Sequence, residues 1–246
     1  MSPVLLEKPA DHIALLRMNR PEAMNALNTA TRETLCEHFE ALTFDDDVRC
    51  IVITGNEDVF IAGADLKEIS TKQTADWAFG DARRMWRVIA ACPKPIISAV
   101  NGFALGGGCE LALSTDVIVA GEGAQFGQPE IRVGIIPGGG GTQRLVRAIG
   151  KYRAMKLLLT GEFVAAQDAL EMGFVSEVVP DAEVLERAMK LAGKIVRQPP
   201  LAVKLTKEVV NAGLDASLET GLILERKAFE ILFDSEDQKE GMREIG

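Results

Sequence analysis

The sequence predicts an α/β protein with parallel strand pairing, followed by a helical C-terminal region. Short apolar runs typical of buried strands alternate with segments of helical period through about residue 180, a pattern that indicates a parallel sheet covered by helices. After Pro180 the strand-like runs stop and the remaining segments have helical spacing. With 246 residues, 47% of them hydrophobic, the chain can bury a large core.

Apolar spacing predicts the elements of the first 120 residues in turn. They are strands at 4–8 and 12–18 with a turn at 9–11, a helix at 29–44, a strand at 49–54, a helix at 75–91, a strand at 96–100, a short helix around 109–114 and a strand at 117–120. The first helix is indicated by Leu35, Phe39 and Leu42, which fall on one stripe. Gly55 and Pro95 mark the end of one buried strand and the start of the next.

The alternation of strands and helices is expected to continue to about residue 180, and the chain after Pro180 is expected to be helical. One helix begins near Thr142 and ends at Gly150. Beyond Pro180 helices are expected at 181–197, 200–212 and 216–233, with breaks at Pro199-Pro200 and Gly213. Long amphipathic helices pack either on their own core or on a neighbouring subunit, and the pattern leaves both possibilities open.

Composition excludes several classes of partner. The net charge of −9 gives no excess of basic residues with which to bind phosphates, so we expect no nucleic-acid binding. No apolar run approaches the roughly 20 residues that span a bilayer, so we expect no membrane partner. The N-terminus lacks the basic and long apolar regions of a signal peptide, which makes the cytoplasm the expected location.

Cysteine and histidine are too few and too scattered for a metal centre. Cys36, Cys50, Cys92 and Cys109 form no C-x-x-C pair, which favours free buried thiols over zinc ligands or disulfides. There are only two histidines, and neither lies near a nucleophile motif. We therefore expect no metal and no Ser-His-Asp triad.

The segment of residues 60–66 follows the strand that ends at Thr54. Open α/β sheets tend to bind ligands at the carboxyl ends of their strands. The small residues Ala62, Gly63 and Ala64 would let a ligand approach the backbone N–H groups. The alternative is a tight loop that needs small residues only for packing.

A second segment joins a buried strand to a helix through Gly106-Gly107-Gly108. Backbone donors and the positive end of the helix dipole are exposed there, which favours an anion. The phosphate-loop motif G-x-x-x-x-G-K-[ST] is absent, and G-x-G-x-x-G fails because Leu111 stands at its last position. We therefore expect a smaller anion, such as a developing oxyanion.

Glu110 follows these glycines inside an otherwise apolar run. A single glutamate on a helix is usually solvated. Buried beside an anion site, however, its carboxyl would be desolvated and its pKa raised, as an acid or base catalyst requires.

The third segment brings Glu130 close to four successive glycines, residues 138–141. Four glycines exclude a regular element and imply close backbone approach or unusual dihedral angles. Glu130 alone could be a surface turn residue. Because Glu110 and Glu130 each lie beside a glycine-rich helix start, the pair favours a site with two carboxylates.

These motifs together resemble the signature of the crotonase (enoyl-CoA hydratase) superfamily, and the resemblance covers nearly the whole chain. The segments that carry it are residues 19–27, 62–65, 97–102, the glycines at 106–108 with Glu110 and Asp116, and residues 137–145. The resemblance implies a spiral of ββα units over residues 1–190 and a helical trimerisation region over 191–246. The family usually forms homotrimers or homohexamers. Its last helix commonly continues into a basic tail, whereas this sequence stops at Gly246.

The resemblance also implies an active site. Its oxyanion hole would use the backbone N–H groups of Ala64 and Gly107, and its acid–base pair would be Glu110 and Glu130. The substrate, an acyl-CoA thioester, would bring coenzyme A as its own part, so no further cofactor is implied. The implied contacts of thioester, pantetheine and coenzyme A are Ala23, Met24, Ala26, Ala62, Asp65, Leu66, Lys67, Gly106 and Pro129.

Membership of the superfamily does not fix the reaction, because several chemistries share the fold. Isomerases commonly keep only the second carboxylate, and dehalogenases use aspartate, so glutamate at both positions favours hydration of a 2-trans-enoyl-CoA. Glu110 is assigned as base and Glu130 as acid. The alternatives are isomerisation of the double bond and a non-catalytic, RNA-binding role.

The sequence leaves the acyl chain, and a role in fatty-acid or aromatic-acid degradation, open. Trp77, Phe79, Met85 and Trp86 either shape an acyl pocket or form a helix core.

Overall fold

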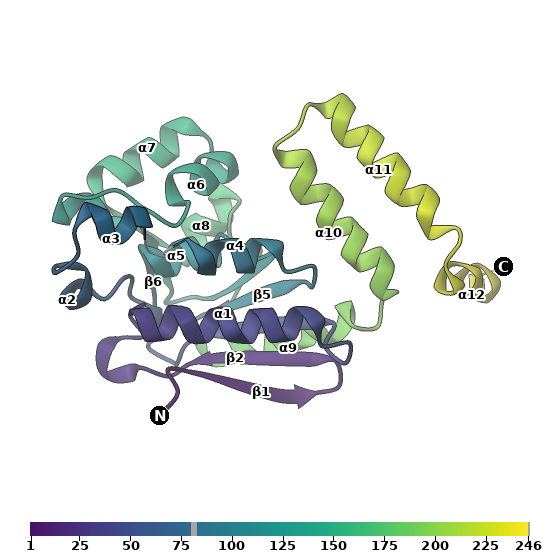
Figure 1. Cartoon of the computed structure of the whole chain (residues 1–246), viewed down its shortest axis with the longest axis horizontal. Helices are drawn as coiled ribbons and strands as arrows, with labels where there is room; N and C mark the ends of the chain where they lie inside the picture. Colours follow the sequence, from purple (N-terminus) through teal and green to yellow (C-terminus); the bar gives the residue numbers. More distant parts are fainter. Residues whose placement is uncertain (80–82, 246) are drawn as a thin grey trace.

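The computed structural model describes residues 1–79 and 83–245. Figure 1 shows a layered body built from residues up to about 195, from which the C-terminal helices extend to one side. The elements are β1 (Val4–Ala10), β2 (Ile13–Met18), η1 (Pro21–Ala23), α1 (Thr29–Phe44), β3 (Cys50–Thr54), β4 (Val59–Ile61), α2 (Leu66–Ile69), α3 (Thr74–Phe79), α4 (Arg84–Ala91), β5 (Ile96–Val100), β6 (Phe103–Leu105), α5 (Gly107–Ala112), β7 (Val117–Gly121), β8 (Gln125–Gly127), η2 (Pro129–Val133), α6 (Gly141–Ile149), α7 (Lys151–Thr160), β9 (Phe163–Ala165), α8 (Ala166–Met172), β10 (Glu177–Val179), η3 (Asp181–Glu183), α9 (Val184–Ile195), α10 (Pro200–Leu214), α11 (Leu218–Leu232) and α12 (Glu236–Ile245).

The larger sheet has six strands in the order β1-β2-β3-β5-β7-β10. β1 pairs antiparallel with β2, and every later pairing is parallel. Every residue of β3 and β5 is buried, because both faces of this sheet are covered. The expected parallel α/β architecture is therefore confirmed.

A smaller sheet of four strands, in the order β4-β6-β8-β9, lies beside the larger one. β4, β6 and β8 each follow a strand of the larger sheet after a short turn, so the chain repeatedly runs through one sheet, then the other, then a helix. Gly102 makes the turn between β5 and β6 at a φ of 57°, and a Cβ there would lie 1.7 Å from the Asp58 carbonyl oxygen. Only glycine fits such a turn.

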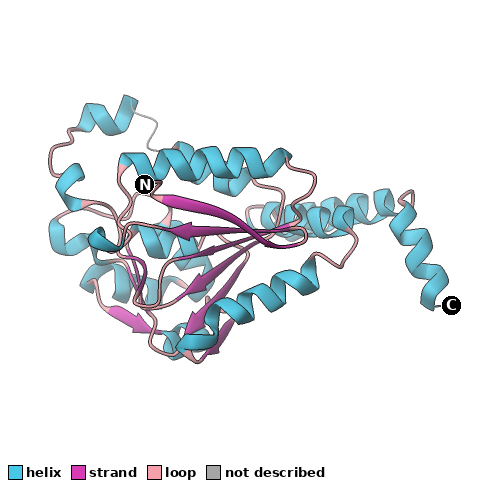
Figure 2. Ribbon diagram, turned by 90° about the horizontal axis from the view of Figure 1, so that it is seen from below, coloured by secondary structure: helices cyan, strands magenta, loops and turns pink. Residues whose placement is uncertain are grey.

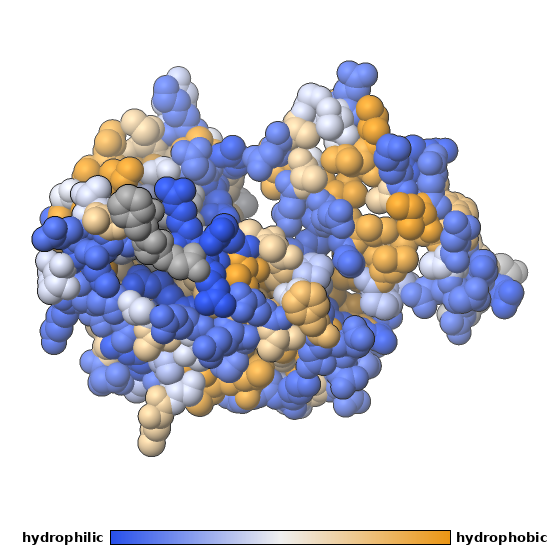
Figure 3. All heavy atoms as spheres, in the orientation of Figure 1, coloured by the Kyte–Doolittle hydropathy of each residue, from blue (hydrophilic) through white to orange (hydrophobic). Residues whose placement is uncertain are grey.

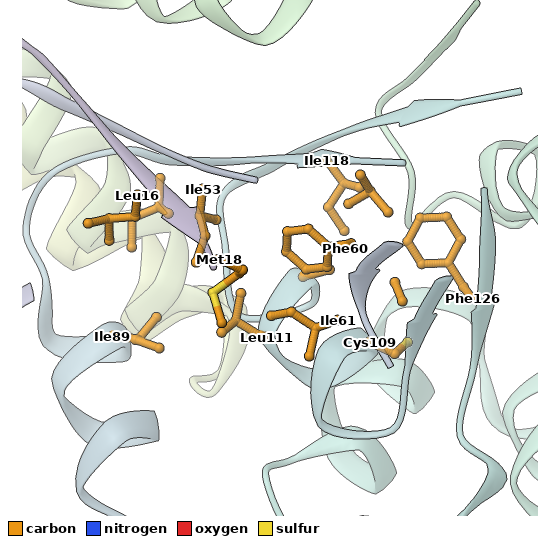
Figure 4. Packing of buried hydrophobic residues seen from close by; sticks show 14 of the residues in the cluster. Leu16, Met18, Ile53, Phe60, Ile61, Ile89, Cys109, Leu111, Ile118 and Phe126 are labelled. Carbon is orange, nitrogen blue, oxygen red and sulfur yellow. The ribbon is translucent and has the colours of Figure 1, made fainter. Parts of the chain in front are cut away.

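Two apolar clusters hold these layers together. One fills the space between the two sheets and the helices α1, α4, α5 and α6; Figure 4 shows Phe60, Ile61, Leu111 and Phe126 pointing into it. The other packs Val184, Ala188 and Ala192 of α9 against the opposite face of the larger sheet. Figure 2, seen from below, shows helices on both sides of this sheet. The residue-190 boundary expected between core and helical region falls inside α9.

Most of the expected elements are confirmed, with three differences. β1 continues to Ala10, so the turn begins at Asp11 rather than Pro9; an irregularity between Glu7 and Ala10 lengthens the strand. Two helices, α3 and α4, replace the single helix expected at 75–91, since Arg83 is in a turn. The short helix α5 begins at Gly107, two residues earlier than expected.

The C-terminal helices make few contacts with the body. In α10 and α11, which the structure describes throughout, no residue is buried. Figure 3 shows hydrophobic surface gathered over these helices, where Leu222, Ile223 and Phe229 are about half exposed. Lys207 of α10 joins them to the body through an ion pair with Asp116, 2.7 Å long. Within the described residues, no helix is long and apolar enough to cross a membrane.

Candidate active site

Glu110 lies in α5 with only 3% of its surface exposed. The backbone N–H groups of Gly139 and Gly141 both donate to its Oε1 atom, at 2.7 and 2.8 Å. The four-glycine loop therefore closes over the carboxylate. Gly140, between the two donors, has a φ of 113°, which favours glycine.

Glu130 lies in η2, on the other side of the start of α5. A Cβ at Gly106 would stand 2.8 Å from the Glu130 Oε1 atom, so the carboxylate reaches that glycine. Pro129 opens the 3-10 turn and orients Glu130. The structure thus brings both predicted glutamates to the same helix start.

The two carboxyls have raised pKa values for related reasons. Burial raises the pKa of Glu110, and the N–H groups of Gly141 and Gly139 oppose that rise by stabilising the anion. Burial also raises the pKa of Glu130, to about 7, with a further contribution from the charge of Glu110. With a pKa of about 7, Glu130 is partly protonated at neutral pH, while the two N–H groups on Glu110 favour its ionised form.

Two backbone donors lie beside the glutamates. Neither the Ala64 N–H nor the Gly107 N–H has a hydrogen-bond acceptor among residues 1–79 and 83–245. The two segments are close, since a Cβ at Gly107 would lie 3.9 Å from the Ala64 nitrogen. A Cβ at Gly108 would lie 2.1 Å from the Ile61 carbonyl oxygen, so glycine is needed there for the approach. Such a pair of free donors can hold an oxyanion.

A buried loop holds Ala64 in place. The Leu27 carbonyl accepts a hydrogen bond from the Asp65 N–H at 3.2 Å, and the Leu27 N–H donates to the Gly63 carbonyl at 2.8 Å. Ala64 therefore lies between two residues that are fixed by backbone hydrogen bonds. Asn25, wholly buried, donates to the carbonyls of Val59 and Phe60 and accepts from the Arg20 N–H.

The other expected contact residues lie along the same loops. The Ala62 N–H donates to the Met24 carbonyl at 3.1 Å, which joins the segment containing Ala23 and Ala26 to the one containing Ala64. Asp65 begins α2, accepts from the Glu68 N–H and pairs with Arg20 at 3.2 Å. Their neighbours in α2 are Leu66, which is exposed, and Lys67.

The aromatic residues of the α3–α4 region have different surroundings. Met85 belongs to the core and Trp77 is exposed. The Trp86 ring lies against Gly139, where a Cβ would stand 2.3 Å from it. Trp86 therefore lies beside the glycine whose N–H binds Glu110. The side chain of Phe79 lies outside the described residues.

Residues 8–245 match the model of the family described as enoyl-CoA hydratase/isomerase. The chain belongs to this family. It is 45% identical over 238 residues to the 2,3-dehydroadipyl-CoA hydratase of Escherichia coli K12, covering 97% of this chain and 93% of the relative. It is 47% identical over 230 residues to a probable mitochondrial enoyl-CoA hydratase of Dictyostelium discoideum, covering 94% and 83%.

Solved structures of the enoyl-CoA hydratase/isomerase family share the fold. The 1.8 Å crystal structure of the enoyl-CoA hydratase from Bacillus anthracis superposes with a TM-score of 0.94 at 37% identity, covering 98% of this chain and 95% of that one. The enoyl-CoA hydratase from Mycobacterium tuberculosis H37Rv gives 0.90 at 36% identity, covering 98% and 94%. The crotonase fold expected from the motifs is confirmed.

Three residues that hold the loops of this site lie in the motif segments 19–27 and 137–145, but the sequence alone assigned them no role. Arg20 and Asn25 hold the loop beside Ala64, and Arg144 donates to the carbonyl of Gly139. Arg20 contacts the side chains of Asn25 and Asp65, Asn25 binds the carbonyls of Val59 and Phe60, and Arg144 binds a carbonyl of the four-glycine loop. A spacing pattern contains no signal for such contacts.

The described residues contain no group of His, Cys, Asp and Glu that could hold a metal ion.

Proposed function

We propose that the protein is an enoyl-CoA hydratase, which adds water reversibly and syn to a 2-trans-enoyl-CoA and forms a 3-hydroxyacyl-CoA. The observation that carries this proposal is the pair of carboxyls with raised pKa, Glu110 and Glu130, beside two free backbone donors. Relatives named as hydratases, matched over nearly the whole chain, support it.

In the forward reaction the base is Glu110 and the acid is Glu130. The Glu110 carboxylate takes a proton from water as the water oxygen bonds to C3. The π electrons move toward the thioester oxygen, and the Glu130 carboxyl gives its proton to C2. The N–H groups of Ala64 and Gly107 stabilise the negative charge on the thioester oxygen, each contributing about 3–4 kcal/mol by analogy with other oxyanion holes.

One proton shared between two neighbouring carboxyls fits this division of roles. Two hydrogen bonds from glycine N–H groups favour the anion at Glu110, whereas burial and the adjacent charge favour the neutral acid at Glu130. The two groups titrate as a coupled pair, so a pH profile reports the pair rather than either residue alone.

Substrate contacts and assembly extend the same proposal. The segments 23–26 and 62–67, with Gly106 and Pro129, would bind the thioester and coenzyme A. The protein would form a homotrimer or homohexamer through α10 and α11, whose exposed apolar residues support an interface between subunits.

Glutamine substitutions test the acid–base pair. Glu110→Gln and Glu130→Gln keep the shape of each side chain but remove its proton chemistry. Each should lower kcat on crotonyl-CoA by at least about a hundredfold. The double variant should lose far less than the product of the two factors, because the residues act together. Glu122→Gln, an exposed change of the same kind, serves as control and should leave kcat unchanged.

The same variants distinguish hydration from isomerisation. An isomerase would need Glu130 and tolerate Glu110→Gln. Near-wild-type turnover of crotonyl-CoA by Glu110→Gln would therefore contradict the proposed hydratase.

A further inference from the structure

Arg144 in α6 contacts the four-glycine loop that binds Glu110. Its Nη1 atom donates to the Gly139 carbonyl at 3.0 Å. A Cβ at Gly140 would lie 2.0 Å from that Nη1 atom, so the guanidinium fills the space beside this glycine. The side chain is half-buried rather than extended into solvent.

Gly139 in this loop therefore binds both side chains. The N–H groups of Gly139 and Gly141 bind Glu110, while the carbonyl of Gly139 binds Arg144. Because Gly140 has a φ of 113° and no side chain, the loop has little conformational preference of its own. Its hold on the carboxylate depends on the contacts that fix it.

The charges around Glu110 come from few elements. α5 packs against β4, β6 and α6. β4 and β6 have no charged residues. η2 brings the acidic Glu130, and the thiol of Cys109 stays neutral because burial raises its pKa to about 12. α6 brings Arg144, whose positive charge opposes the effect of burial on the pKa of Glu110.

Arg147, one turn later in α6, has different neighbours. It donates to Gln143 and pairs with Asp215 at 3.3 Å, with half of its side chain exposed. The helix therefore provides two arginines of the same chemistry, and Arg144 is the one that binds the loop over Glu110.

We propose that Arg144 is a positioning residue for Glu110: its guanidinium fixes the Gly139 carbonyl, which keeps the Gly139 and Gly141 N–H groups on the carboxylate, and its charge favours the ionised base. This inference rests on the proposed hydratase function. It assigns a role in the reaction to a residue that does not touch the reacting atoms.

The test measures kcat on crotonyl-CoA against pH for the wild type, Arg144→Gln, Arg144→Lys and the matched control Arg147→Gln. Without the positive charge the pKa of Glu110 rises, so the acid limb of the Arg144→Gln profile should move to higher pH by on the order of one unit. At a pH below the acid limb, a shift of one unit corresponds to about a tenfold lower kcat than that of the wild type. Arg144→Lys, which keeps the charge, and Arg147→Gln should keep the wild-type limb.

Other outcomes separate failure of the inference from failure of the function. A wild type without hydratase activity overturns the function itself. An active wild type with an unmoved acid limb in Arg144→Gln, whatever the change in kcat, overturns the positioning role. If circular dichroism shows that Arg144→Gln does not fold, Arg144→Met, which removes the charge and keeps an unbranched side chain, replaces it; an unmoved limb there is equally decisive.

Discussion

At the scale of single residues, Glu110 and Glu130 are the same side chain in two different surroundings. Glu110 accepts two backbone N–H bonds, while Glu130 is raised in pKa to about 7 by burial and by the charge of its neighbour. Neighbouring carboxyls in different environments can take opposite roles, one as acid and one as base. The proposed acid and base would therefore be two residues of one amino-acid type.

The raised pKa of Glu130 should reduce stability at high pH. The folded protein keeps a proton on Glu130 up to about pH 7, whereas the unfolded chain loses it near the ordinary glutamate value. The stability from this proton is complete below the unfolded pKa and is lost as pH rises through the folded one. Glu130→Gln should therefore have a higher Tm than the wild type at pH 8 and a similar Tm at pH 4. Equal Tm values at pH 8 would contradict the raised pKa.

Asn25 should be important for stability, although its amide cannot act as an acid or a base. Its amide satisfies two buried carbonyls and the N–H of Arg20, and its φ of 56° is one that asparagine tolerates better than most residues. Asn25→Ala leaves these groups unpaired, which should cost at least about 1–3 kcal/mol in urea unfolding. Asn19→Ala, which removes an exposed bond to the Ser2 carbonyl, is the control and should cost much less.

At the scale of elements, the three glycines at the start of α5 are each required for a different reason. Gly106 turns the chain at a φ of 50°, Gly108 lies against the Ile61 carbonyl, and Gly107 offers its N–H beside Ala64. Of the three, only Gly107 is proposed to contact the substrate, through its N–H. A substitution at Gly107 can therefore remove this donor without filling the space beside Gly108.

Gly107→Pro provides that substitution. Gly107 is the first residue of α5, the helix position that accepts proline most readily. Loss of its N–H should lower kcat by about a hundred- to a thousandfold, with KM for crotonyl-CoA changed far less. Circular dichroism provides the control for folding. A folded Gly107→Pro enzyme with full activity would rule out this N–H as an oxyanion donor.

Elements and site residues were predictable where the signal is local. The longer helices and the buried strands have apolar periods that a sequence displays, and the glycine runs mark the two helix starts beside Glu110 and Glu130. β4, β6, β8, β9 and β10 have three residues each, too few for a period to appear. The contact between Arg144 and Gly139 depends on how the loop folds back over α5, which spacing does not encode.

At the scale of the whole molecule, the body and the C-terminal helices differ in how far their apolar residues are buried. The body buries two large clusters of apolar residues, whereas no residue of α11 is buried. Exposed apolar patches of this kind mark protein interfaces. This contrast is the structural reason to expect association of several copies.

Charge substitutions in α11 should prevent that association. Ile223→Asp and Phe229→Asp each place a carboxylate in the apolar face, so light scattering should show smaller particles than the trimer or hexamer proposed for the wild type. Phe44→Asp, at an exposed position of the body, is the control and should leave the assembly intact. A monomeric wild type would contradict the proposed assembly.

The ion pair between Lys207 and Asp116 has a consequence for ionic strength. Its side chains are only 10% and 24% exposed, and Lys207 also donates to the Lys94 carbonyl at 2.8 Å. Arg147 and Asp215, by contrast, are 50% and 74% exposed. Dissolved salt weakens exposed pairs far more than partly buried ones. In concentrated salt the second pair should therefore dissociate first, while the attachment of α10 to the sheet, and with it the direction in which the C-terminal helices leave the body, is preserved.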